Sequence, residues 1–182
     1  NNKGIFTVNQ LSFTYRPRRR KKRVGKHQRF EYALKALALR EQRTYIKELP
    51  QINPSRIEVF LDFEGLPDER FVYLIGMVIK EKESERIFTF WADSKDREEK
   101  IFKQFLKVLS KFKDYTIYHY GSYEISNLNR VAKKIDSKNK DKIESVIKNS
   151  QNLLSIFATN IYTPTYTNGL KDIANFLGFK WT

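Results

Sequence analysis

Acidic residues interrupt a largely apolar run at residues 57–65 (IEVFLDFEG), and this run constrains the fold more than any other part of the sequence. Side chains alternate between the two faces of a β-strand, so Asp62 and Glu64 project from one face while Val59, Leu61 and Phe63 project from the other. The run therefore predicts a strand with one apolar, core-facing side and two carboxylates on its other side.

The paired carboxylates suggest a site for a hard divalent cation. Mg²⁺ takes oxygen ligands and typically binds one or two carboxylates together with water and substrate phosphate. Asp62 and Glu64 at a strand end therefore predict a metal- and phosphate-binding site with Mg²⁺ or Mn²⁺ as the cofactor. The alternative is a strand that runs out into solvent, with Gly65, Pro67 and Asp68 forming its turn.

The order of the predicted elements indicates an α/β fold. Apolar runs and helical periodicity predict three strands connected by hairpins and then a helix, a strand and a helix, at residues 56–63, 71–79, 86–91, 101–112, 115–120 and 125–135. This order is typical of a ribonuclease H-like mixed sheet flanked by helices, in which the first strand is central and carries acids. We expect residues 56–182 to form this domain.

Residues 1–55 predict a basic helical segment with a helix over 30–43, and we expect them to be the tail of a preceding region. The only methionine is Met77, so we expect the chain to be a piece of a longer polypeptide.

The net charge of +14 is concentrated near the N-terminus. Residues 16–29 contain nine of the 35 Lys and Arg residues and no acid. Such a cluster neutralises phosphates without reading sequence, so we expect it to bind nucleic acid. The alternatives are a solvated linker or a patch that contacts an acidic neighbouring domain. The predicted phosphate contacts are Arg18, Arg19, Arg20, Lys21, Lys22 and Arg23.

Composition excludes several other classes of protein. The absence of cysteine excludes disulfides, thiolate zinc sites and cysteine nucleophiles. No apolar stretch approaches the roughly 20 residues that span a bilayer, and no secretory signal begins the sequence. We therefore expect a cytoplasmic location.

Four segments carry recognisable motifs: residues 4–23 (GIFTVNQLSFTYRPRRRKKR), 60–65 (FLDFEG), 119–124 (HYGSYE) and 168–179 (NGLKDIANFLGF). Together they resemble the RecB-like nuclease family, whose members carry a ribonuclease H-like exonuclease module of the DEDD (YprB-like) type. The resemblance implies that Asp62 and Glu64 ligate the catalytic metals and that Glu124 is the acid of the second motif.

The sequence departs from the family pattern at two motifs. Many exonucleases of this class have Asp where Glu124 stands, and the Asn often found four residues earlier is Tyr120 here. The family's last acid follows the segment at 168–179, so we expect it to lie beyond the last residue of this chain. Asp172 is the one acid near this segment and is the candidate for the last catalytic acid within the chain. The alternative is that Asp172 is exposed to solvent on the polar side of its helix.

The resemblance also suggests groups that orient the attacking water. His119 and Tyr166 are the local candidates, although a histidine at a strand end is often a structural hydrogen-bonding residue. We therefore predict a divalent-metal-dependent 3′–5′ exonuclease acting on DNA or RNA, with the other domains of its polypeptide as partners. The alternatives are a non-catalytic nucleic-acid-binding module of a larger nuclease or helicase protein, and a structural domain that has the fold without the activity.

Overall fold

The computed structural model describes residues 4–17 and 30–180. The chain divides into two compact units, one formed by Asn1–Gln51 with Leu154–Thr182 and the other by Ile52–Leu153. Residues 154–182, which the sequence analysis placed with the main domain, thus cluster with the N-terminal segment. The carboxylates of interest all belong to the unit Ile52–Leu153.

A five-stranded mixed sheet organises the unit Ile52–Leu153, with the strand order β4-β3-β2-β5-β6. β2 pairs antiparallel with β3 and parallel with β5, so the first strand of the unit is central, as predicted. The strands are β2 (Ile57–Leu66), β3 (Phe71–Glu81), β4 (Ser84–Trp91), β5 (Tyr115–His119) and β6 (Ser150–Asn152). This arrangement confirms the predicted ribonuclease H-like fold class.

Alternation along β2 fixes what each face of the sheet carries. Val59, Leu61 and Phe63 are buried, whereas Asp62 and Glu64 between and beyond them are exposed. The predicted division of this strand into an apolar and an acidic face is therefore confirmed.

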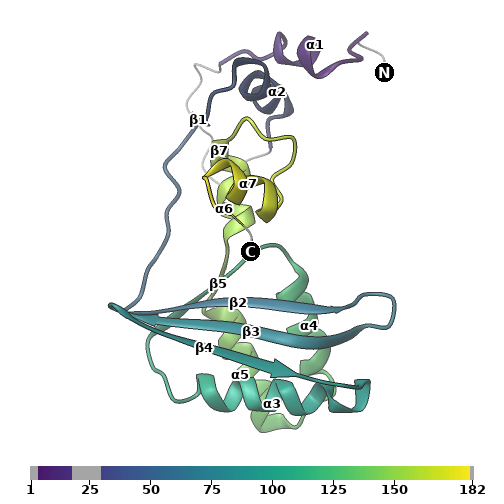
Figure 1. Cartoon of the computed structure of the whole chain (residues 1–182), viewed down its shortest axis with the longest axis vertical. Helices are drawn as coiled ribbons and strands as arrows, with labels where there is room; N and C mark the ends of the chain where they lie inside the picture. Colours follow the sequence, from purple (N-terminus) through teal and green to yellow (C-terminus); the bar gives the residue numbers. More distant parts are fainter. Residues whose placement is uncertain (1–3, 18–29, 181–182) are drawn as a thin grey trace. The chain divides into compact units, whose positions relative to one another are not determined.

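Helices cover the apolar face of the sheet (Figure 1). An apolar stripe on α3 (Glu98–Leu109), which follows the short 3₁₀ helix Lys95–Arg97, buries Phe102 and Phe105 edge-on against Phe63 of β2. α4 (Tyr123–Ala132) also contacts β2, and α5 (Ser137–Lys148) packs against α3 and α4. The sequence analysis gave no element between residues 137 and 151, where the structure has α5 and β6.

The other unit is small and mainly helical. β1 (Tyr45–Ile46) pairs antiparallel with β7 (Ile161–Tyr162), and Leu34, Ala38 and Tyr162 form its buried core. Its helices are α1 (Val8–Ser12), α2 (Tyr32–Glu41), α6 (Leu153–Asn160) and α7 (Leu170–Phe176).

A buried lysine ties α2 to a loop far along the chain. Lys35 Nζ donates to the Thr163 carbonyl oxygen and hydroxyl, the Thr165 hydroxyl and the Asn168 side-chain oxygen, at 2.8–3.2 Å. Lys35 is only 7% exposed, which is rare for a lysine. Oxygen acceptors from the loop satisfy the ammonium group, which allows its burial.

None of the helices in the described part of the chain is both long enough and apolar enough to cross a membrane.

Candidate nuclease site

The candidate site, called the acidic site below, consists of Asp62 and Glu64 on β2 and Glu124 on α4. Both β2 carboxylates lie on the exposed face of the central strand, close to its C-terminal end. The strand pairing with β3 shifts register between Glu64 and Gly65, so Glu64 lies where the local backbone departs from regular pairing. Irregularities of this kind, β-bulges among them, re-aim side chains and are common beside functional sites.

Glu124 approaches from the turn that connects β5 to α4. It lies in the first turn of α4, where the helix dipole favours a negative charge. Only 3% of Glu124 is exposed, which is unusual for a carboxylate without an Arg or Lys partner. His119, the last residue of β5, is also buried, and its Nδ1 lies 3.4 Å from Glu124 Oε2. Neither atom has a hydrogen-bond partner among the described residues.

The three carboxylates influence one another electrostatically. Although the Asp62 side chain reaches the surface, neighbouring atoms shield its carboxylate from part of the solvent, and this desolvation raises its pKa above the ordinary value. The negative charges of Glu64 and then Glu124 raise the pKa of Asp62 further. The acidic site therefore holds more negative charge than its surroundings neutralise.

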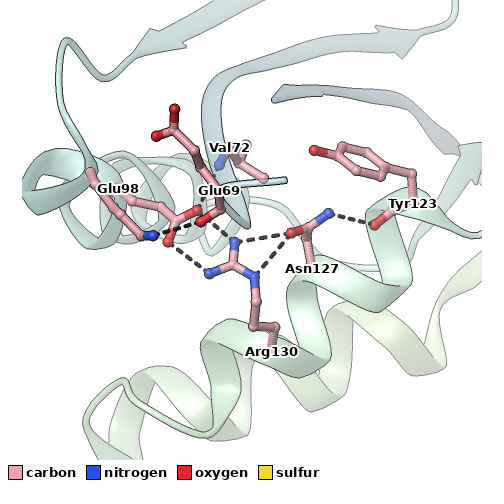
Figure 2. Close-up of polar contacts among 7 residues, drawn as sticks. Glu69, Val72, Glu98, Tyr123, Asn127 and Arg130 are labelled. Atoms are coloured by element: carbon pink, nitrogen blue, oxygen red, sulfur yellow. Dashed lines mark hydrogen bonds and ion pairs between the residues drawn. The ribbon is translucent and has the colours of Figure 1, made fainter. Parts of the chain in front are cut away.

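A part-buried ion pair between Arg130 and Glu98 anchors α4 (Figure 2). Arg130 Nη1 donates to Glu98 Oε2 at 2.8 Å, and Arg130 Nη2 donates to Glu98 Oε1 at 2.5 Å. Glu98 Oε1 also accepts the backbone N–H of Val72 on β3 at 2.7 Å. The pair thus joins α4 to the start of α3 and to the sheet, with the two-pronged geometry that makes Arg–carboxylate pairs strong.

The same network continues along α4 toward β2. Arg130 Nε donates to Asn127 Oδ1, and Asn127 Nδ2 donates to the Tyr123 carbonyl oxygen at 3.0 Å (Figure 2). The Tyr123 hydroxyl lies directly over Gly65, where an added Cβ would come within 2.2 Å of it. Since Tyr123 precedes Glu124 and Gly65 follows Glu64, this contact brings together the backbones that carry two of the three acids.

The sequence analysis missed this network, although part of it left a signal. Tyr123, Asn127 and Arg130 recur at the spacing of one helix face, which a search for polar residues at helical periodicity would have found. Glu98, the partner on another helix, has no such signal because it is 32 residues away in the sequence.

The structure brings together four of the predicted residues, namely Asp62, Glu64, Glu124 and His119, in the unit Ile52–Leu153. Tyr166, which is exposed, and Asp172, which accepts a hydrogen bond from the Thr167 hydroxyl, belong to the other unit. The six predicted phosphate contacts at residues 18–23 lie outside the described residues.

The donor atoms of the acidic site fit a divalent cation. Carboxylate oxygens are the preferred ligands of Mg²⁺ and Mn²⁺, and a cation would offset the repulsion that raises the pKa of Asp62. Within residues 4–17 and 30–180, no three His, Asp or Glu side chains are grouped closely enough to surround an ion. Binding therefore requires the carboxylates to draw closer or water and substrate oxygens to complete the coordination.

Two surface pockets lie away from the acidic site. The one in the same unit, of about 400 Å³, lies between β4 and α3 and includes Trp91 and Lys107 in its lining. The other, of about 820 Å³, is in the second unit and includes Leu49 and Ile156 in its lining. Neither pocket is lined by Asp62, Glu64 or Glu124.

The five-stranded mixed sheet with its central first strand and flanking helices defines a ribonuclease H-like α/β protein. The sequence model of the RNase_H superfamily matches residues 59–182, about two thirds of the chain. The chain therefore belongs to the RNase H superfamily, whose members have nuclease-type activity on nucleic acids. No curated protein matches the chain.

Proposed function

We propose that this chain is a divalent-metal-dependent nuclease module that hydrolyses nucleic-acid phosphodiesters as a 3′–5′ exonuclease. One observation carries the proposal: Asp62, Glu64 and Glu124, from two different elements, concentrate negative charge that no Arg or Lys ion pair offsets among the described residues. Placing carboxylates together raises the folded-state energy, so a bound cation or a catalytic role has to account for it.

The roles of the residues follow from their positions. Bound divalent ions supply an activated water nucleophile and stabilise the charge on the leaving oxygen. In the proposal, Asp62 and Glu64 hold them from the rigid central strand, and Glu124 holds them from the first turn of α4. A ligand set carried by a strand and a helix is positioned more precisely than one carried by loops.

The charges of the chain indicate how a nucleic-acid substrate would bind. The acidic site would repel phosphates if no cation were bound, so cation binding must precede substrate binding at this position. We propose that residues 18–23 supply sequence-independent phosphate contacts elsewhere on the nucleic acid. Neutralising these six residues should flatten the salt dependence of binding, whereas an unchanged slope would rule the segment out as the phosphate contact.

The proposal is tested by titrating Mn²⁺ into the whole chain in a calorimeter and by incubating the loaded chain with single- and double-stranded DNA and RNA. Asp62→Ala should remove Mn²⁺ binding and cleavage. Asp68→Ala, in the exposed turn after β2, is the matched control and should change neither. A ladder that shortens from the 3′ end would indicate an exonuclease, and internal cuts would indicate an endonuclease.

Failure of the wild-type chain to bind Mn²⁺ would contradict the proposal. If that chain still bound nucleic acid in a salt-dependent manner, the non-catalytic nucleic-acid-binding module would be the better description.

A further inference from the structure

Two buried polar atoms, His119 Nδ1 and Glu124 Oε2, face each other without a hydrogen bond. The atoms are 3.4 Å apart, and the two side chains are 3% and 4% exposed. An N–H···O hydrogen bond is typically about 2.7–3.2 Å long, so this pair is too far apart for a good one. A buried polar atom without a hydrogen bond is unfavourable, and a ligand bound between or beside these two atoms would satisfy both.

The separation fits two ligands of one metal ion. Metal–nitrogen and metal–oxygen bonds to histidine and carboxylate are about 2.0–2.2 Å long for Zn²⁺. Two such ligands at a tetrahedral angle are about 3.4 Å apart, whereas ligands at the right angle of an octahedron are about 3.0 Å apart. The 3.4 Å between His119 Nδ1 and Glu124 Oε2 matches the tetrahedral separation.

We infer that His119 Nδ1, together with Glu124, is a ligand of one divalent ion in the proposed nuclease site, and that this nitrogen ligand selects the metal. The inference rests on the proposed function. Imidazole suits transition metals, whereas Mg²⁺ favours oxygen ligands in near-ideal octahedral geometry. His119 therefore biases the site toward Co²⁺ or Zn²⁺ and away from Mg²⁺.

The competing explanation is purely structural. A movement of about 0.5 Å would let His119 donate a hydrogen bond to Glu124 and hold that side chain in place. Under this explanation the histidine never touches the metal, so spectroscopy that detects nitrogen bound to the metal separates the two.

The test is pulsed electron paramagnetic resonance of Mn²⁺ bound to the whole chain. The sequence has only two histidines, His27 and His119, so an imidazole signal has only two sources. We expect hyperfine coupling from a ligated imidazole nitrogen in the wild-type chain and in His27→Gln, and its loss in His119→Gln. The wild-type and His27→Gln spectra decide the question even if His119→Gln fails to fold.

A second measurement compares affinities across metals. His119→Gln should weaken Co²⁺ binding at least about tenfold, the scale seen when metal-site partners are removed, and should weaken Mg²⁺ binding much less. Equal losses for both metals, or none, would overturn the selectivity.

The outcomes separate this inference from the proposed function. Mn²⁺ binding that Asp62→Ala removes, but that shows no imidazole coupling, would overturn the role of His119 and leave the nuclease proposal intact. Coupling that disappears in His27→Gln would also overturn it. An absence of any Mn²⁺ binding would contradict both.

Discussion

Replacing Asp62 by Asn should make the metal-free chain more stable while destroying its activity. The two β2 carboxylates are two residues apart on one face of a strand, which places them about 7 Å apart. At the dielectric constant of water, appropriate for exposed groups, such a pair repels by about 0.6 kcal/mol. Asn has nearly the same shape and removes this repulsion. The melting temperature should therefore rise by about 1–2 °C in a chelating buffer.

The pH dependence of the stability difference between Asp62→Asn and wild type provides a second, independent test. The pKa of Asp62 is raised in the folded chain, so its favourable contribution is complete below the ordinary value of 3.8 and is lost as the pH rises through the raised pKa. The advantage of Asp62→Asn over wild type should thus be small near pH 4, grow as the pH rises and then level off. Asp68→Asn, in the exposed turn, should show no such trend.

Divalent metal should reverse the order of stability. At a Mn²⁺ concentration 100 times the dissociation constant, binding stabilises the wild-type chain by about 2.7 kcal/mol. Asp62→Asn should gain much less, because one ligand has lost its charge. Differential scanning calorimetry with chelator and with Mn²⁺ makes the comparison. If Asp62→Asn melted at or below the wild-type temperature in chelator at neutral pH, the claim of electrostatic strain at this site would be wrong.

Three further predictions concern the contacts that support the fold. Arg130→Met leaves the buried Glu98 without its partner and should lower the free energy of unfolding, measured by urea denaturation, by about 3–5 kcal/mol. Adding Glu98→Gln should recover part of this loss, because Gln still accepts the backbone hydrogen bond but carries no charge. Gly65→Ala places a Cβ 2.4 Å from a carbonyl oxygen and should cost about 1–3 kcal/mol, whereas Gly76→Ala, whose nearest contact is 3.7 Å, should be tolerated. Lys35→Met leaves several oxygen acceptors unsatisfied, so hydrogen exchange at residues 163–168 should accelerate; unchanged exchange would show that the lysine does not hold this loop.

The acidic face of β2 could be predicted from the sequence because strand alternation is a local property. Asp62 and Glu64 share a face whatever the rest of the chain does. The helices at α3 and α4 were also predictable, because their apolar residues recur at helical spacing and bury one stripe.

Features that depend on distant partners could not be predicted in the same way. β6 is three polar residues without alternation, and only its parallel pairing with β5 makes it a strand. Lys35 looked like a surface residue because its acceptors lie 128–133 residues away. The approach of His119 to Glu124 depends on the turn between β5 and α4. The periodicity of the sequence does not predict the geometry of this turn.

A comparison of two buried acids, Glu124 on α4 and Glu98 on α3, shows why we assign function to Glu124 and structure to Glu98. Both carboxylates are almost fully buried, at 3% and 8% exposure. Glu98 is matched by two hydrogen bonds from Arg130 and one from the Val72 backbone, which is how proteins stabilise a buried charge that serves the fold. Glu124 has a helix N-terminus and an unbonded histidine, so its surroundings leave one oxygen free for a ligand. A buried acid that the fold leaves unmatched, next to one that it matches fully, is what a site prepared for a cation requires.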